Sequence, residues 1–521
     1  MRRYSLARTG APKFVLSPLS FLAMICCLGT IVIVNNADSS TYYVNNAGSP
    51  ACGNAAGRGT QALPFCTISY ALGRMTGGDT VYVRAGTYNE ALYIAGPAGT
   101  AGANTLIAAY PGDSVTLLGS GVNSGRCKIA NASYITFRGF TITNYNQGLF
   151  VDSSSNITIQ GCTIHHVGQE GLHIHMNSSF VTVDGCTVHD TRQWQYNGEG
   201  IYIGTGDAAP VDNTNNVTIR NTTIYNTTDE GIEFKIGTHH ITAEGNNIYN
   251  VNLGSDWSQN GNSVGAIEVN NAVGAVQHYD SDPQQVVRNN FIHDVKTAIR
   301  AGTGITIYNN VIRHVSGYGI YVDNQSNDSY TRVIYHNTID AASANAVYHV
   351  GGTQDVRNNI GPAAAKNLPA QNSYFVDTAR ADYHLVKGSA PIDAGDDLTA
   401  IVPTDRDGVS RKLYGAPDLG AYEYSGSSLI GELAIPKLAS LDMSILIVIQ
   451  NRIDFVIPQA DKVNLEILDI SGRQVCTLVD AWMEKGRHSV VWNMKDYPAG
   501  IYLFKLVIGG SSIIQKEIIM K

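Results

Sequence analysis

The sequence is poor in charged residues, and basic residues do not dominate among them. Only 15% of its 521 residues are Asp, Glu, Lys or Arg, and the formal net charge is -8. A nucleic-acid-binding protein concentrates Lys and Arg on one face, so we expect no nucleic-acid partner. The chain is also too long for one ordinary compact core, which predicts several domains or a repeat array.

Cysteine is scarce as well, with eight residues in the chain, and none has the spacing of a zinc site. Cys52 and Cys66 flank a glycine-rich loop and could form a disulfide in an oxidising compartment. Cys162 and Cys186 recur at equivalent repeat positions, which favours stacked core thiols. No nucleotide or flavin motif is present, so we expect no organic cofactor.

The N-terminus has the pattern of an export signal. Four basic residues precede an apolar run over residues 14–34, and polar residues follow it. This pattern predicts a signal peptide over residues 1–37. An uncleaved membrane anchor is the alternative, because the run is long enough to span a bilayer.

Glycine and tyrosine are abundant, with 53 and 28 residues, and this composition favours short strands joined by tight turns. A short phrase that ends in Ile or Val recurs between residues 133 and 360. Most gaps between its closing residues are 20 to 27 residues, and two are 36 and 44. The closing residues are Ile142, Ile164, Val188, Ile224, Ile248, Ile292, Ile312, Ile339 and Ile360.

A second alternating phrase fills each gap, so every repeat holds at least two short strands. Stacked repeats of this length predict an all-β, single-stranded parallel β-helix, in which equivalent residues of adjacent coils lie about 4.8 Å apart. One column is expected to form a side-chain ladder along the stack. This column is Cys162, Cys186, Thr222, Asn246, Asn290, Asn310, Asn337 and Asn358.

Residues 60–121 contain three short motifs, which are Pro-Phe-Cys-Thr-Ile at 64–68, Gly-Gly-Asp-Thr-Val-Tyr-Val at 77–83 and Gly-Thr-Tyr at 86–88. Here the chain resembles the N-terminal caps of right-handed β-helix polysaccharide lyases, namely the chondroitinase B and alginate lyase family and the family-nine pectate lyases. The resemblance covers about residues 40–360. It implies a right-handed β-helix over this range and an extracellular polysaccharide as partner.

The C-terminal third changes character. Residues 361–424 resemble a module that closes bacterial surface β-helices, and residues 425–435 have the composition of a linker. Residues 436–521 alternate as strands and predict a small β-sandwich. The sequences Asp-Ile-Ser-Gly at 469–472 and Pro-Ala-Gly-Ile-Tyr at 498–502 resemble the C-terminal sorting domain of type IX secretion cargo. This resemblance implies the type IX machinery as a partner, and a secreted protein or attachment to the outer-membrane surface.

Stacking also predicts a strip of ionisable side chains that point outward from adjacent coils, between inward apolar residues. We call this set the charged strip. It comprises His173, His175, Tyr202, Glu233, Lys235, Glu268, Arg300, Tyr321 and Asp323, and neighbouring turns add Glu170, Glu199, Asp229 and Glu230. Insertions at 189–199, 206–215, 252–264 and 277–285 fall in the same stretch and predict a cleft.

The charged strip suggests roles in β-elimination, which needs a base, a neutraliser of the substrate carboxylate and an acid. Lys235 could be the base and Arg300 the neutralising cation, with Tyr202 or His173 as the acid. Calcium prefers several oxygen ligands, and the metal candidates are Glu233, Glu268, Asp229 and Glu230. Candidate substrate-binding side chains are His175, Trp194, Tyr196, Trp257 and Tyr321.

The string from Asp229 to Lys235 partly resembles two lyase families. Chondroitinase-like lyases have calcium-binding Glu residues, then a Lys and a later Arg, which Glu233, Lys235 and Arg300 follow in order. In family-nine pectate lyases an Asp-Asp-Gly-x-Asp string binds calcium, and residues 229–233 are similar to it with longer side chains. Their Lys base comes one coil later, where this chain has Glu268.

Three functions are therefore compatible with the sequence. The first is a lyase that cleaves an acidic, uronate-containing polysaccharide. The second is a glycoside hydrolase with Glu233 and Glu268 as paired carboxylates, at about the 5 Å separation of retaining enzymes. The third is a non-catalytic surface β-helix that binds glycans or has a structural role in the cell envelope, in which the charged strip is a solvated ladder of salt bridges.

Overall fold

The computed structural model describes most of residues 39–424 and 445–519. The predicted signal peptide and linker lie outside the described residues. Within the described part, no helix has the length and apolar character needed to cross a membrane. The internal gaps are at 97, 193–197, 207–211, 253–263, 270–283, 324–328, 342, 412–414, 450–451, 458, 471, 484–485, 492–497, 499 and 510.

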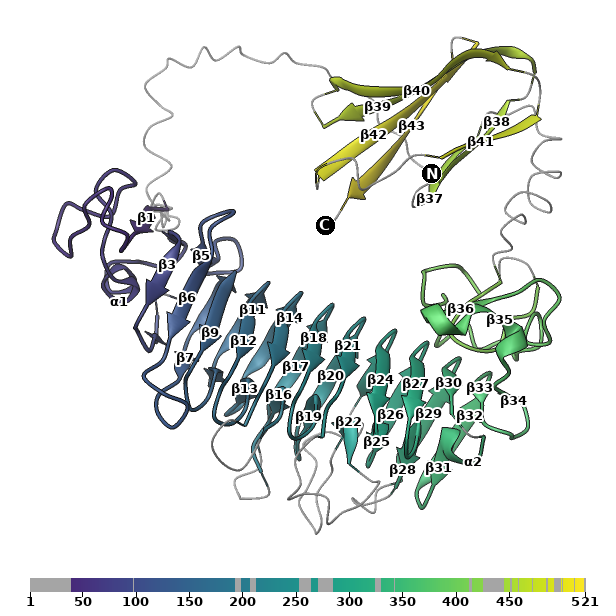
Figure 1. The fold of residues 1–521 in the computed structure, drawn as a ribbon, viewed down its shortest axis with the longest axis horizontal. Helices are drawn as coiled ribbons and strands as arrows, with labels where there is room; N and C mark the ends of the chain where they lie inside the picture. The colour runs from purple at the N-terminus through teal and green to yellow at the C-terminus, as the bar shows by residue number, and fades with distance from the viewer. Residues whose placement is uncertain are drawn as a thin grey trace, which may run out of the picture.

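Three long parallel sheets wind into a right-handed β-helix, as the repeats and the resemblance predicted (Figure 1). Sheet A consists of β1 (Thr41–Val44), β2 (Thr80–Val83), β5 (Thr105–Ala109), β8 (Ser133–Arg138), β11 (Ser155–Gln160), β14 (Ser179–Asp184), β17 (Asn215–Arg220), β20 (His239–Glu244), β23 (Gln285–Arg288), β26 (Ile305–Tyr308), β29 (Thr331–Tyr335) and β32 (Thr353–Arg357).

The other two sheets follow the same order along the axis. Sheet B consists of β3 (Gly86–Tyr88), β6 (Val115–Leu118), β9 (Phe140–Thr143), β12 (Thr163–His165), β15 (Thr187–His189), β18 (Thr223–Tyr225), β21 (Asn247–Tyr249), β24 (Phe291–Val295), β27 (Val311–Val315), β30 (Thr338–Asp340), β33 (Ile360–Gly361) and β34 (Leu368–Pro369). Sheet C consists of β4 (Tyr93–Ile94), β7 (Cys127–Ala130), β10 (Leu149–Asp152), β13 (Leu172–His175), β16 (Ile201–Ile203), β19 (Ile232–Phe234), β22 (Gly265–Val269), β25 (Thr297–Ala301), β28 (Ile320–Val322) and β31 (Val347–His349).

The core of the β-helix is a set of aliphatic columns. Ile164, Val188, Ile224 and Ile248 follow one another in register on sheet B and are fully buried. Each strand alternates buried and partly exposed residues because successive side chains point to opposite faces of a sheet. The spacing of the closing Ile and Val residues therefore fixes the register of adjacent coils.

An asparagine ladder runs through the later coils, as expected, but its last member differs. Asn310 Nδ2 donates to Asn337 Oδ1 at 2.9 Å, and Asn337 Nδ2 donates to Asn359 Oδ1 at 3.0 Å. The prediction of Asn358 is wrong, because Thr338 pairs with Ile360 and shifts the last coil by one residue. Asn358 instead hydrogen-bonds His336 at 3.0 Å.

Both ends of the β-helix are covered. At the N-terminal end, Cys52 and Cys66 form the expected disulfide, and α1 (Ile68–Leu72) packs Ile68 and Leu72 into the core. Covering the end of the stack protects its open strand edges from pairing with another chain. Cys162 and Cys186 are free and buried, as expected.

At the C-terminal end, the closing segment packs Tyr374, Phe375 and Tyr383 against Val311 and Ile360 of the last coils. This segment contains the 3-10 helices η2 (Asn372–Tyr374) and η3 (Thr378–Arg380) and the antiparallel strands β35 (Phe375–Asp377) and β36 (Asp382–Leu385). A short helix, α2 (Ser343–Ala346), precedes β31 in the β-helix itself.

The C-terminal domain is built from two antiparallel sheets. Phe455 of one sheet and Leu465 and Phe504 of the other share one buried core, which is the arrangement of a small β-sandwich. The first sheet contains β37 (Ile445–Ile449), β38 (Arg452–Ile457) and β41 (Gly486–Val491). The second contains β39 (Asp461–Asp469), β40 (Gln474–Met483), β42 (Gly500–Ile508) and β43 (Ser511–Ile519).

Candidate functional site

One row of side chains on sheet C brings most of the charged strip together. Adjacent strands pair in register along the whole row, so each member lies opposite the next. The row is His173, Tyr202, Glu233, Glu268, Arg300 and Tyr321. Its members point away from the aliphatic core because they alternate with inward residues such as Ile232 and Phe234.

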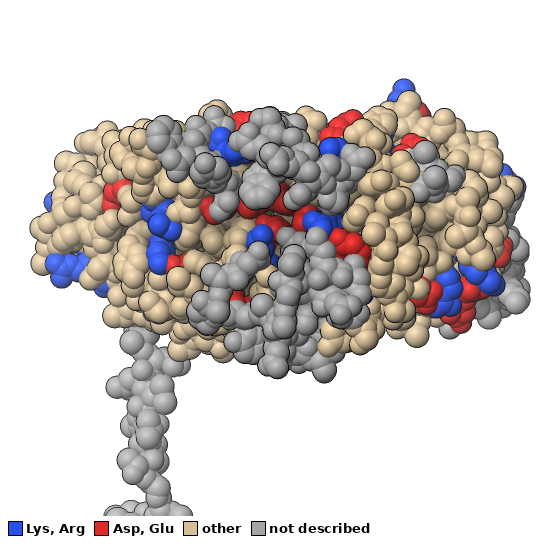
Figure 2. Space-filling model, turned by 90° about the horizontal axis from the view of Figure 1, so that it is seen from below, with Lys and Arg blue, Asp and Glu red and all other residues tan. Residues whose placement is uncertain are grey.

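These side chains are buried although they lie outside the helix core. Glu233 and Glu268 are each 2% exposed, and Arg300 is 7% exposed. These groups are therefore buried and not solvated as expected, although the expected salt bridges are present between Glu233 and Lys235 and between Glu268 and Arg300. Figure 2 shows acidic and basic side chains gathered across the middle of this face. Because buried charges must be paired or bind a cation, the partners of each group decide what the site can do.

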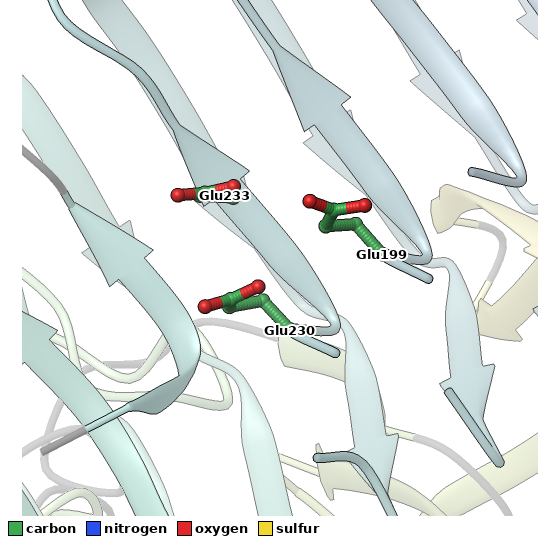
Figure 3. A group of neighbouring side chains, drawn as sticks. All are labelled: Glu199, Glu230 and Glu233. Atoms are coloured by element: carbon green, nitrogen blue, oxygen red, sulfur yellow. The ribbon is translucent and has the colours of Figure 1, made fainter. Parts of the chain in front are cut away.

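Three carboxylates form what we call the glutamate cluster, namely Glu199, Glu230 and Glu233. Oxygens of all three lie within 4.8 Å of one another, and all three side chains are buried. Figure 3 shows the carboxylates gathered in one space beside β16 and β19. Among the described residues, no cation lies within salt-bridge distance of Glu199 or Glu230.

Glu199 was outside the predicted metal set, although the signal for it is present in the sequence. A Glu-Gly pair precedes three consecutive strands of sheet C, with Glu170, Glu199 and Glu230 as its acidic residues. The backbone N–H groups of Gly171 and Gly200 donate to the carbonyls of Glu199 and Glu230, at 3.0 and 2.9 Å. These bonds stack the three glutamates in one column, which adjoins the row that contains Glu233.

Burial and repulsion from neighbouring carboxylates make Glu199, Glu230 and Asp229 hold their protons more tightly. Burial, with the neighbouring carboxylates, raises the pKa of Glu199 and of Glu230 well above the usual range. The same causes raise the pKa of Asp229 to about 6. Oxygen Oε2 of Glu199 is buried and has no hydrogen-bond partner. An acid-rich, oxygen-lined site of this kind suits a hard divalent cation.

Lys235 lies directly beside the glutamate cluster. Its Nζ is 2.6 Å from Glu233 Oε1 and 5.2 Å from the centre of the Tyr202 ring. Burial acts to lower the pKa of Lys235, but Glu233, together with Tyr202 and Glu230, outweighs burial and raises that pKa above its usual value. Lys235 is therefore protonated while Glu233 is its ion-pair partner.

Arg300 is shared between two carboxylates. Its guanidinium donates to Glu268 Oε1 at 2.8 Å and to Asp323 Oδ2 at 2.9 Å. Burial raises the pKa of Glu268 to about 7, although Arg300 opposes this shift. Glu268 Oε2 also accepts the backbone N–H of Gly265 at 3.0 Å. Arg300 thus has less charge available for a substrate than the sequence suggested.

The two acid candidates differ in their protonation. Burial lowers the pKa of His173 to about 3, so the ring is neutral near pH 7, and its Nε2 donates to the Gly204 carbonyl at 2.8 Å. Burial raises the pKa of Tyr202, so its phenol keeps its proton. Of the two residues, Tyr202 is the better placed proton donor, at the edge of the Lys235 site.

The candidate substrate-binding residues separate into three groups. His175 stacks on His173 with ring centres 4.0 Å apart, and its Nε2 is 2.5 Å from Asp152 Oδ1. Tyr321 lies at the other end of the row, with its ring centre 5.7 Å from that of Tyr348. The remaining three lie outside the described residues, and they are Trp194, Tyr196 and Trp257.

Three segments of the chain match known families. Residues 42–266 match the Pel9A-like, right handed beta helix region, and residues 208–361 match the right handed beta helix region. Residues 449–521 match the secretion system C-terminal sorting domain. Pectate lyase PEL9 from Emericella nidulans is 25% identical over 190 residues, which are 34% of this chain and 46% of that protein.

Solved structures show the same architecture. Pectate lyase Pel9A matches 74% of this chain and 96% of its own, with 17% identity and a TM-score of 0.51. Rhamnogalacturonan lyase matches 66% and 92%, with 15% identity and the same TM-score of 0.51. The chain is therefore a right-handed β-helix protein that resembles polysaccharide lyases, and its type IX sorting domain makes it a secreted or cell-surface protein.

Proposed function

We propose that this protein is polysaccharide-active and cleaves an acidic, uronate-containing polysaccharide by β-elimination on sheet C. The observation that carries the proposal is the glutamate cluster, in which Glu199 and Glu230 have no cation within salt-bridge distance among the described residues, directly beside Lys235. The similarity of residues 42–266 to the Pel9A-like family supports the same class of reaction. Its sorting domain would deliver such an enzyme to extracellular polysaccharide.

The glutamate cluster, with Asp229 beside it, would hold a divalent cation, and calcium is the first candidate because all the donors are oxygens. A bound cation supplies positive charge opposite the uronate carboxylate. Glu268, which the sequence also suggested as a metal ligand, is not one of these donors, because its carboxylate is paired with Arg300 at 2.8 Å.

Lys235 is the proposed base for the proton next to the uronate carboxylate. The Glu233 carboxylate keeps Lys235 protonated, and burial acts in the opposite direction. When the bound cation takes up the negative charge of Glu233, burial becomes the main influence on Lys235 and lowers its pKa. The neutral amine can then accept the proton.

Tyr202 is the proposed donor of a proton to the leaving oxygen. Its phenol remains protonated because burial raises its pKa, and its ring lies beside the Lys235 ammonium. Arg300, next to last in the row, holds Glu268 and Asp323 in place and therefore has less charge left for the substrate. His173 packs against Tyr202 with ring centres 4.5 Å apart, on the coil opposite to that of Glu233, and His175 stacks on His173.

A glycoside hydrolase is the second candidate, because Glu268 has a pKa raised to about 7 next to Glu233 on the adjacent strand. A carboxyl group that stays protonated near pH 7, beside a second carboxylate, is what a general acid and its partner require. Against it, Glu233 contacts Lys235 at 2.6 Å and Glu268 contacts Arg300 at 2.8 Å.

The test is an assay for the unsaturated product, which absorbs at about 235 nm. The full chain is incubated with polygalacturonate, alginate and glycosaminoglycans, with calcium or with a chelator. We expect absorbance on at least one substrate, dependent on calcium and lost in Lys235→Ala. The matched control is Lys366→Ala, which removes a lysine that is ion-paired with Asp396 at 2.7 Å in the closing segment.

New reducing ends without absorbance would replace the lyase with the hydrolase. No cleavage of any substrate would leave the non-catalytic glycan-binding protein as the account of this site.

A further inference from the structure

A second groove lies on sheet A, a different sheet from the one that carries the charged strip. It has a volume of about 850 Å³ and crosses β11, β14, β17 and β20, which lie side by side (Figure 1). None of the residues that line it is Asp, Glu, Lys or Arg. Because this groove has no charged lining residue and the charged strip lies on another sheet, we expect the groove to bind a different ligand from that of the strip.

One row of the residues that line this groove is a threonine ladder. Thr158, Thr182, Thr218 and Thr242 face one another in register on consecutive strands. Their side chains are partly exposed, so hydroxyl groups recur at every coil, about 4.8 Å apart. A hydroxyl can both donate and accept a hydrogen bond, as can the hydroxyls of a sugar.

A second row, two residues away along the same strands, alternates rings and amides. Tyr134, Asn156, Phe180, Asn216 and His240 occupy the same position of consecutive coils. The rings therefore recur at every second coil, roughly 10 Å apart. This spacing is about the length of two pyranose units in an extended chain.

Aromatic rings are costly at these positions. The backbone φ is 54° at Tyr134 and at Phe180, in the left-handed region that Asn tolerates and bulky residues rarely adopt. The Phe180 side chain is also 57% exposed. Asn156 and Asn216 show that the fold accepts Asn at the same position, so the rings are not required for folding. Strained, exposed groups of this kind indicate a binding role.

We propose that the sheet A groove binds a neutral glycan chain that lies along the helix axis. Tyr134, Phe180 and His240 support the faces of alternate sugar units, and the threonine ladder and the amides bond their hydroxyls. His240 is held in place by His239, whose Nδ1 is 2.7 Å from Nδ1 of His240. The site is non-catalytic and goes beyond the proposed function, since it would anchor the protein to a neutral polymer while sheet C meets an acidic one.

The test is electrophoresis of the full chain through native gels that contain hydroxyethyl cellulose, xylan, galactomannan or polygalacturonate. At least one neutral polymer should retard the wild type, and Phe180→Asn should weaken that retardation about tenfold. Asn suits the backbone at this position, so we expect Phe180→Asn to stay folded. The matched control is Val376→Asn, which replaces another exposed apolar side chain, 56% exposed, in the closing segment.

A chelator and Lys235→Ala should leave this retardation unchanged, which separates it from the lyase proposal. Retardation by polygalacturonate alone, no retardation by any neutral polymer, or equal retardation of the wild type and Phe180→Asn would each overturn the proposal.

Discussion

Two columns of buried polar side chains run along the same β-helix, the asparagine ladder and the column of Glu170, Glu199 and Glu230. They differ in whether their buried polar atoms find hydrogen-bond partners within the column. In the asparagine ladder, Asn310 donates to Asn337 and accepts from Asn290, so every amide has partners above and below. In the glutamate column, Glu199 and Glu230 can only accept hydrogen bonds when ionised, and neither supplies a donor to the other. The amides of the first ladder satisfy one another's hydrogen bonds, whereas the ionised carboxylates of the second repel one another.

This difference separates a structural column from a functional one. Buried polar groups that are fully hydrogen-bonded stabilise a stack and carry no charge that a ligand could use. Buried acids without partners reduce stability and shift their pKa values, which is the usual signature of a binding or catalytic site. The same stacking geometry thus produces both, and only the side-chain chemistry differs.

The largest expected effect is on turnover when Lys235 is replaced by Arg. Arginine can keep the ion pair with Glu233 but cannot release its proton at working pH. We expect Lys235→Arg to lower kcat by about 100- to 10,000-fold, with unchanged thermal stability. Steady-state kinetics and thermal unfolding together check this prediction, and wild-type turnover in the variant would show that Lys235 only balances charge.

The next effect comes from placing a charge in the asparagine ladder. Asn310→Asp loses the donors to Val287 O and Asn337 Oδ1, and it sets a carboxylate against those acceptors. We expect the free energy of unfolding to fall by about 3 kcal/mol. Urea unfolding of the full chain measures it, and a loss below about 0.5 kcal/mol would mean that the ladder is not structurally important.

Removing a charge from the glutamate column should have the opposite sign. Without added cation, and at a pH high enough to ionise the glutamate cluster, Glu199→Gln relieves repulsion from Glu230 and Glu233, so we expect the free energy of unfolding to rise by about 1 kcal/mol. In the same variant, calcium should stabilise the protein less than it stabilises the wild type. Destabilisation in chelator would contradict the view that this carboxylate is uncompensated.

The smallest effect is the pH dependence of the cation-free protein. Asp229 and Glu268 have pKa values raised to about 6 and about 7, above the value of about 4 expected in the unfolded chain. Such groups favour the folded state most below pH 4, and this contribution is lost as pH rises through 6 to 7. The wild type should therefore lose more thermal stability between pH 5 and pH 8 than Asp229→Asn does, and equal losses would argue against the shift.

Much of the fold could be predicted because the β-helix repeats its signal in every coil. The recurring Ile and Val residues fix the register, so Glu233, Glu268 and Arg300 lie in one row as expected. The prediction fails at Asn358, where the last coil shifts by one residue and no further repeat follows to reveal it.

The site could be predicted only in part. Alternation along a strand tells which residues leave the core, but it does not tell how deeply they are covered, so the burial of Glu233 was missed. Strand alternation does not predict Glu199 as a metal ligand, because this residue lies in the turn before its strand. It reaches the glutamate cluster because the turns of adjacent coils stack on one another. The sharing of Arg300 by Glu268 and Asp323 depends on side-chain rotamers, which no sequence pattern specifies.

The most direct test of the central claim is a calorimetric titration of the full chain with calcium at pH 6.5, in two buffers with different heats of ionisation. We expect one site whose occupation releases protons, because acids with raised pKa values must ionise to bind the cation, and we expect Glu199→Gln to lose it. No binding at millimolar calcium, or binding that Glu199→Gln leaves unchanged, would contradict the claim that the glutamate cluster is a cation site.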